Sequence, residues 1–320
     1  MSDPALLTPG QMARRRFRRH RPARASAYFL AALLLLVVAW PWVLTVAGHL
    51  GPAGRAFAAA HAPDALTEAQ FAPPGAAHWF GTDLHGRDLF SRVLYGAQIS
   101  LLVGAVGAGV SLVIGVLWGA VAGYLGGRWD SWLMRIVDIL YSLPSVIFVI
   151  VLITVLEDRF KLVLAHHAPP ELAKLARLLF LFVGLGAVSW LTMARIVRGQ
   201  VLTLRHRPFV EASRVLGAGW GHILRRHILP NVFGVVIVYL TLTVPAVILY
   251  ESFLSYLGLG IQPPMASWGS LIAEGAEQIN PIRVYWWLLA FPGLFLVTTL
   301  LALNFVGDGL REAWDVRAER

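Results

Sequence analysis

Long apolar runs alternate with polar, arginine-bearing stretches along this chain. Each run has about the 20 residues that an α-helix needs to cross a bilayer, so the pattern predicts six transmembrane helices. Their approximate bounds are 28–47, 99–124, 132–156, 178–196, 232–253 and 284–306. Four runs contain an internal proline, and Pro144 predicts a kink in the third. The fold class that follows is an all-α polytopic membrane protein.

The composition supports this fold class and narrows the partners. The 320 residues are 57% hydrophobic and only 14% charged, whereas soluble proteins carry about a quarter charged residues. The chain has no cysteine, which excludes disulfides and thiolate metal sites. The net charge of +9 comes almost entirely from arginine, since only Lys161 and Lys174 are lysines. We therefore expect contact with membrane lipid and none with nucleic acid.

The arginines gather in two stretches, and their placement predicts the topology. Seven lie in the polar tail 1–27, which we expect to be disordered, and seven within 195–226, against three in 48–97. Cytoplasmic loops carry an excess of arginine and lysine, so both termini and the loop 197–231 are expected in the cytoplasm. The loops 48–97, 157–177 and 254–283 are then expected outside the plasma membrane (the inner membrane of a two-membrane cell). We interpret the first apolar run as an uncleaved anchor, because it is too long for a signal peptide.

The stretch Pro208–Asn231 has the pattern of a short amphipathic helix followed by a break. Apolar or small residues fall on one face at helical spacing; they are Phe209, Ala212, Ser213, Leu216 and Trp220. We expect the helix to run from Pro208 to Trp220, with the glycines at 217, 219 and 221 breaking it. Two interpretations stay open: a handle for a partner outside the bilayer, or an interfacial helix lying on anionic lipid.

Other candidate features have plain structural interpretations. Gly115, Gly119 and Gly123 form a stripe that favours close helix packing, with a glycine-lined passage as the alternative. Intramembrane charge suggests function, but Asp138, Glu251 and Asp308 lie near span ends and are expected to be anchors. For Asn304 we expect an interhelical hydrogen bond, and for the pair His166 and His167 two solvated loop residues. We predict no metal site.

The 208–231 stretch resembles a loop found in permease subunits of binding-protein-dependent ABC importers. In that loop a glutamate and two small residues precede a glycine and, further on, an isoleucine and a proline. The corresponding residues here are Glu211, Ala212, Ser213, Gly217, Ile228 and Pro230. The block GTDLHGRDLFSRVLYGAQISLLVG at 81–104, the run LSYLGLGIQPP at 254–264 and the C-terminal NFVGDGLREAWDVR are similar to the C-type subunit of the dipeptide, oligopeptide and nickel branch.

The resemblance implies the type I (MetI-like) transmembrane fold, with residues 98–308 as the permease domain and 309–320 as a cytoplasmic tail. It implies two ATPase subunits, a second permease and an extracytoplasmic solute-binding protein as partners. ATP and magnesium would bind to the ATPases, so this chain would need no cofactor and would not be an enzyme itself. The coupling residues would be Phe209, Glu211, Ala212, Ser213, Leu216, Gly217, Ile228 and Pro230. The loop 157–177 is longer than is usual in the family, which leaves its contacts open.

The solute stays open as well. The resemblance makes di- or oligopeptides the default, with nickel, opines and glutathione as alternatives. The chain contains no Gly-Lys pair and hence no P-loop for ATP, and it lacks the H-E-x-x-H and G-x-S-x-G signatures of two hydrolase classes. A self-sufficient secondary transporter is the rival class. It would need internal repeats and ionisable groups at mid-membrane, and neither is evident here.

Overall fold

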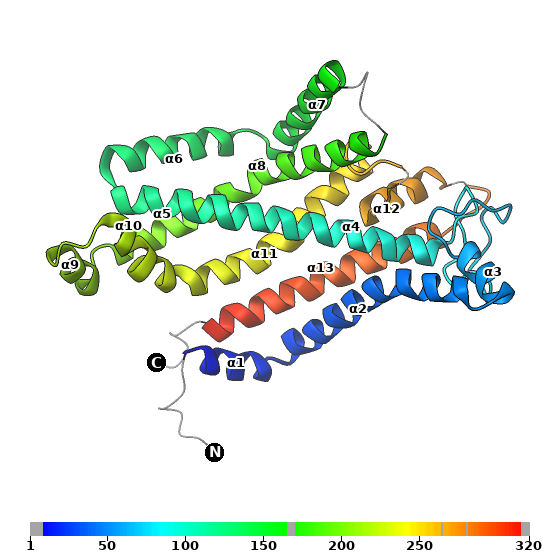
Figure 1. Ribbon diagram of the computed structural model, residues 1–320, viewed down its shortest axis with the longest axis horizontal. Coiled ribbons are helices and arrows are strands. Elements are labelled where there is room, and N and C mark those ends of the chain that lie inside the picture. Colours follow the sequence, from blue (N-terminus) through cyan, green and yellow to red (C-terminus); the bar gives the residue numbers. More distant parts are fainter. Residues whose placement is uncertain (1–8, 165–169, 264, 280, 315–320) are drawn as a thin grey trace. The chain divides into compact units, whose positions relative to one another are not determined.

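The structure is a computed structural model that describes residues 9–164, 170–263, 265–279 and 281–314. In these residues it is helical throughout, apart from connecting segments and one isolated bridge between Thr82 and Asp88 (Figure 1). The α-helices are α1 Pro9–Arg19, α2 Arg21–His49, α3 Pro52–Ala60, α4 Leu89–Val110, α5 Val116–Leu125, α6 Gly127–Ser142, α7 Ser145–Leu164, α8 Pro170–Leu204, α9 Pro208–Val215, α10 Trp220–Ile223, α11 Leu229–Tyr256, α12 Trp268–Glu277 and α13 Trp287–Trp314. Two π-helical turns, η2 Ser111–Gly115 and η3 Leu224–Ile228, continue α4 into α5 and α10 into α11.

Five continuous helical stretches are long and apolar enough to cross a membrane. They are Arg21–His49, Leu89–Leu125, Leu179–Leu204, Trp220–Tyr256 and Trp287–Trp314. A sixth span is present if α6 and the first part of α7 count as one, but that pair is bent by 92°. The predicted kink at Pro144 is therefore a complete break. Leu143 is extended, with φ −78° and ψ 139°, as expected for a residue that precedes proline.

Two predicted irregular segments prove more helical than expected. The tail 1–27, which we expected to lack structure, contains α1 and the first turns of α2. The predicted loop 157–177 is entered by α7 up to Leu164 and by α8 from Pro170 onward. Both segments are polar, but arginine, leucine, alanine and glutamate are strong helix formers. Polarity therefore does not by itself predict a loop. His166 and His167 lie outside the described residues.

Residue contacts divide the chain into two compact units, which are described separately. Unit 1 comprises Met1–Arg24, Gly104–Val247 and Asn304–Arg320. Unit 2 comprises Ala25–Val103 and Ile248–Leu303. The predicted coupling stretch belongs to unit 1, whereas the loop 48–97 belongs to unit 2.

In unit 1, α5 packs closely along α8 through the predicted glycine stripe (Figure 1). A Cβ atom on Gly115 would lie 2.6 Å from Cβ of Met193, and one on Gly119 would collide with the carbonyl oxygen of Ala194. A Cβ atom on Gly123 would lie 2.9 Å from another carbonyl oxygen, that of Arg198. The glycines therefore allow two backbones to approach each other, as the packing interpretation predicts.

Ion pairs join α6 to α8 in the same unit. Arg198 donates to both carboxylate oxygens of Asp130, with Nε–Oδ1 at 2.5 Å and Nη2–Oδ2 at 2.7 Å. Arg195 donates to Oδ1 of Asp138 at 2.7 Å, and its guanidinium lies 3.9 Å from the ring centre of Tyr141. Asp138 is thus an anchor between two helices, as expected.

In unit 2, α12 is held against α4 and α11 by buried polar contacts. Trp268 is fully buried, and its indole Nε1 donates to the carbonyl of Val93 at 3.1 Å. Glu251 is fully buried too, and it accepts hydrogen bonds from Oγ of Ser255 at 2.6 Å and Oγ of Ser100 at 3.3 Å. These contacts support the anchoring interpretation of Glu251.

Candidate functional site

The helix of the 208–231 segment is shorter than predicted. Pro208 begins α9 without cost, because its missing N–H has no partner in a first helical turn, and the helix ends at Val215. Gly217 has φ +84°, its N–H donates to the carbonyl of Arg214, and Ala218 N–H donates to the carbonyl of Ser213. This pair of bonds is the Schellman motif that ends helices. The prediction of one helix through Trp220 is therefore wrong, and a separate turn, α10, begins there.

One face of this segment is buried in unit 1. Val210 is fully buried and belongs to a cluster with Ile223, Ile228, Val197 and Val201. Val210 lies in α9, Ile223 in α10 and Ile228 in η3. Val197 and Val201 both lie in α8. The cluster therefore fixes the short helices to the ends of both α8 and α11. Ile228, one of the predicted coupling residues, has this internal packing role.

The opposite face of the segment is apolar and exposed. Leu216 is 87% exposed, Trp220 60% and Phe209 42%, and Glu211 and Ala212 are exposed beside them. Ser213 is half-buried, and its hydroxyl donates to the carbonyl of Phe209 at 3.0 Å. Gly217 and Pro230 are exposed, the latter in the first turn of α11. A cluster of large exposed apolar side chains is typical of a surface that contacts a partner or a membrane.

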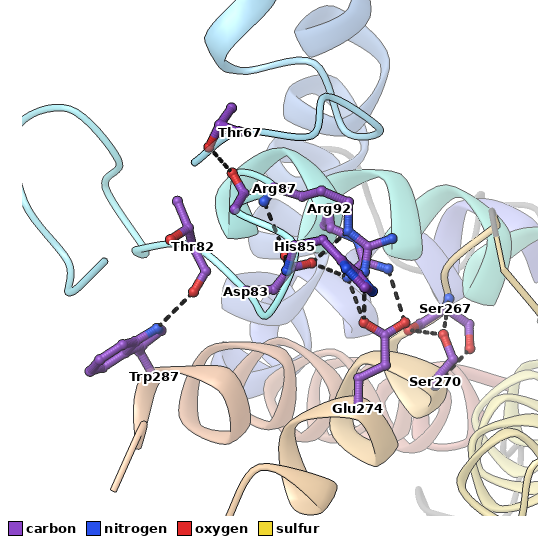
Figure 2. Close-up of polar contacts among 11 residues, drawn as sticks. Thr67, Thr82, Asp83, His85, Arg87, Arg92, Ser267, Ser270, Glu274 and Trp287 are labelled. Carbon is purple, nitrogen blue, oxygen red and sulfur yellow. Dashed lines mark hydrogen bonds and ion pairs between the residues drawn. The ribbon is translucent and has the colours of Figure 1, made fainter. Parts of the chain in front are cut away.

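A second site, which is polar, lies in unit 2, where two acids and two arginines form an ion cluster of three buried side chains and the partly exposed Glu274 (Figure 2). Arg92 is 2% exposed, and its Nη1 lies 2.6 Å from both Asp83 Oδ2 and Glu274 Oε2. Its Nη2 donates to Glu274 Oε1 at 3.0 Å. Arg87 contacts the same acids, with Nε 2.7 Å from Asp83 and Nη2 3.2 Å from Glu274. The four charges, Asp83, Arg87, Arg92 and Glu274, balance, and we call them the ion cluster.

The sequence GTDLHGRD folds locally to present this ion cluster. Gly81 and Gly86 have φ of +78° and +71°, values that other residues rarely adopt. Between them, Asp83 Oδ1 accepts hydrogen bonds from the N–H groups of His85 at 2.8 Å and Arg87 at 3.0 Å. Burial alone would raise the pKa of Asp83, but the charge of Arg92, the Arg87 N–H and the Arg87 guanidinium outweigh it and lower this pKa.

α12 brings the fourth charge of the ion cluster into place. Ser267 caps this helix, accepting from Ser270 N–H while the Ser270 hydroxyl accepts from Ser267 N–H. Glu274 then projects from the next turn toward Arg92, as Figure 2 shows. Nearby, Trp287 Nε1 donates to the carbonyl of Thr82 at 3.2 Å. The sequence assigns no role to Asp83, Arg87 or Arg92. It does not single out Glu274 either, because the partners of Glu274 lie far away along the chain.

The membrane-spanning helices belong to a known class of membrane protein. The chain belongs to the family of binding-protein-dependent transport system inner membrane components, whose family model matches residues 115–320. Residues 8–63 match a second model, the N-terminal TM domain of oligopeptide transport permease C. The resemblance drawn from the sequence motifs is thereby confirmed, and the chain is a multi-pass permease subunit.

Several curated relatives match nearly the whole chain. It is 47% identical over 306 residues to the oligopeptide transport system permease protein OppC of Escherichia coli K12, covering 95% of this chain and 90% of that protein. It is 42% identical over 316 residues to the dipeptide transport system permease protein DppC of Bacillus subtilis, covering 98% and 88%. Among solved structures, an inward-facing MetNI methionine ABC transporter matches 71% of this chain and 97% of its own, with TM-score 0.50 and 20% identity. That likeness confirms the fold.

Proposed function

We propose that this chain forms half of the translocation pathway of an ATP-driven importer for di- or oligopeptides. The observation that carries the proposal is sequence identity. It is at least 42% over nearly the whole chain to permeases named for oligopeptide and dipeptide transport. In this proposal the transport cycle uses no cofactor bound to this chain. ATP and magnesium bind to two partner ATPases, and a solute-binding protein delivers the peptide to this chain and a second permease.

The exposed face of α9 is the proposed contact with one ATPase. Phe209, Ala212 and Leu216 offer exposed apolar surface to a partner. Glu211 lies in the first turn of α9, where the helix dipole favours a negative charge, and it is exposed to meet a cation of the partner. The Schellman turn at Gly217 lets the chain leave the contact sharply.

Packing of Val210 supports a mechanical role for α9. When the ATPases close on ATP, α9 moves with the ATPase that holds it. Because Val210 and Ile223 pack on Val197 and Val201 of α8, the movement reaches the transmembrane helices directly. ATP binding then selects the outward-open state of the pathway, and hydrolysis restores the inward-open state. This mechanism requires α9 to lie in the cytoplasm, as the arginine distribution predicts.

A charge reversal at Glu211 tests the coupling. We expect Glu211→Lys to lower peptide uptake and transport-coupled ATP hydrolysis at least about tenfold, the effect of losing about 1.4 kcal/mol at the contact, while insertion into the membrane is unchanged. The matched control is Glu277→Lys, which changes a carboxylate that is also exposed, at the end of α12. Unchanged uptake by the Glu211 variant would contradict the coupling role.

The solute needs a separate test. Cells that lack this chain are complemented with it, and uptake of a labelled dipeptide, a labelled pentapeptide, labelled glutathione and ⁶³Ni²⁺ is compared. We expect peptide uptake to return. Restoration of nickel or glutathione uptake alone would contradict the peptide assignment while leaving the permease family untouched.

A further inference from the structure

Three side chains of types that can bind a metal lie close together in unit 2, apart from the ion cluster. They are His61, the residue that follows α3, His78 in the connecting segment, and Asp88, the residue before α4. One ligand atom from each lies within 4.8 Å of those of the other two. Nothing in the mechanism above uses these residues.

The hydrogen bonds of His61 leave one ring nitrogen free to bind a ligand. Its Nδ1 lies 3.0 Å from the carbonyl oxygen of Phe57, and because a carbonyl only accepts, Nδ1 must carry the proton. Nε2 then bears a lone pair. The whole residue is only 5% exposed. Its Nε2 is buried and has no hydrogen-bond partner among the described residues. Leaving a buried polar atom unpaired costs about 1–3 kcal/mol. A ligand bound to Nε2 would remove this cost.

His78 and Asp88 complete the set. His78 Nδ1 lies 2.9 Å from Asp88 Oδ1, close enough for both atoms to bind one ion, which would replace the proton that the pair shares. Asp88 Oδ2 accepts from Ser91 N–H at 2.9 Å and caps α4, yet a carboxylate offers about four lone-pair sites. Asp88 is fully buried, and buried charges in proteins are paired with a cation or coordinate a metal.

Aromatic rings hold the site in place. Phe57 stacks on His61 with ring centres 4.2 Å apart, and Trp40 and Trp79 lie 6.4 and 6.0 Å from the same imidazole. These rings fix the His61 ring and keep its surroundings apolar. The side chain of His78 is 12% exposed, which gives an ion a route from solvent.

We propose that His61, His78 and Asp88 bind a divalent transition-metal ion such as Zn²⁺. Imidazole nitrogens with a carboxylate suit zinc, whereas calcium and magnesium prefer oxygen ligands. The ion is a resident structural one that ties the end of α3 to the start of α4. The inference does not depend on which solute the importer carries.

Zinc binding by the full chain tests the site. The chain is purified in detergent with a tag that contains no histidine, stripped with EDTA, and titrated with Zn²⁺ by calorimetry, with metal content measured after dialysis. We expect about one Zn²⁺ per chain. Because the chain has no cysteine, thiolates cannot contribute. The His61→Phe variant keeps the ring that stacks on Phe57 and removes the ligand, and His78→Gln removes the second imidazole. Each should weaken binding about 10- to 100-fold or more.

Two further variants keep the test decisive. His85→Gln changes an exposed histidine in the same segment and should bind Zn²⁺ like the original chain. Asp88→Asn keeps a helix-capping oxygen but loses the charge, and should also weaken binding. Zn²⁺ should raise the melting temperature of the original chain and of His85→Gln, and leave that of His61→Phe unchanged. Failure of the original chain to bind one Zn²⁺, or equal binding by His61→Phe and His78→Gln, would overturn the proposal.

Discussion

Val210 and Leu216 are apolar residues of the same segment, and they have different roles. Val210 is fully buried, whereas Leu216 is 87% exposed. We expect Val210→Ala to lower the free energy of unfolding by about 2 kcal/mol, from the lost burial and the cavity left behind. Leu216→Ala should change it by less than about 0.5 kcal/mol while lowering ATPase coupling. Thermal unfolding in detergent and ATP hydrolysis by the assembled importer separate the two effects, and a large loss of stability from Leu216→Ala would contradict this division.

Asp83 gives the ion cluster a defined response to pH. Its pKa lies below the ordinary value of 3.8, so the ionised form is favoured by folding. The stabilisation is fully present above that ordinary value and is lost as the pH falls through the lower folded pKa. We expect the melting-temperature difference between the original chain and Asp83→Asn to be constant from about pH 8 to pH 5 and to shrink below about pH 4. A difference that already shrinks between pH 7 and pH 5 would contradict the lowered pKa.

At the scale of elements, the α5–α8 contact depends on glycine. A Cβ atom on Gly119 would collide with the backbone of Ala194, whereas one on Gly109 of α4 would meet nothing within 4 Å. We expect Gly119→Ala to destabilise the protein by about 1–3 kcal/mol through overcrowding, and Gly109→Ala to be neutral or slightly stabilising. Melting temperatures of the two variants in the same detergent make the comparison, and equal values would show that α5 and α8 do not pack this closely.

Hydropathy predicted five of the six transmembrane helices well, because a bilayer-crossing helix must be apolar along its whole length. The predicted third span, 132–156, is instead broken at Pro144. The ends of the helices near the surface were harder to predict. Leu216 and Trp220 continue the apolar spacing of α9 through a turn that Gly217 imposes, so periodicity overran the true end at Val215. In α1 and around 157–177 the helix formers are charged, and no apolar run marked them.

The sites also differ in how well the sequence predicts them. The coupling segment is continuous in sequence, so its pattern and family resemblance were visible at once. The ion cluster needs Arg92 and Glu274, which are 182 residues apart, and no local spacing connects them. His61 and Asp88 are likewise brought together only by the fold, which explains why the sequence predicted no metal site.

At the scale of the whole molecule, the bent pair α6–α7 decides the topology. If the pair crosses the membrane as one span, both termini lie on the same side; if it does not, they lie on opposite sides. The chain has no cysteine, so single cysteines at Gly10, Ala69, Leu216 and Arg311 can be probed with a membrane-impermeant maleimide on intact cells. We expect labelling from outside at Ala69→Cys alone. Labelling of Arg311→Cys without Gly10→Cys would contradict the six-span topology.

The long sequence separation inside the ion cluster also sets an order of events during synthesis. Glu274 follows Arg92 by 182 residues, and Trp287 follows its acceptor Thr82 by 205. At about 5–20 residues per second, the first half of the cluster waits about 10–40 s for its partners. Until then Asp83 and Arg92 can pair only with each other and with Arg87. A nascent chain that stops before α12 therefore never closes this joint, and its unfinished loop is a ready substrate for the proteases that clear incomplete membrane proteins.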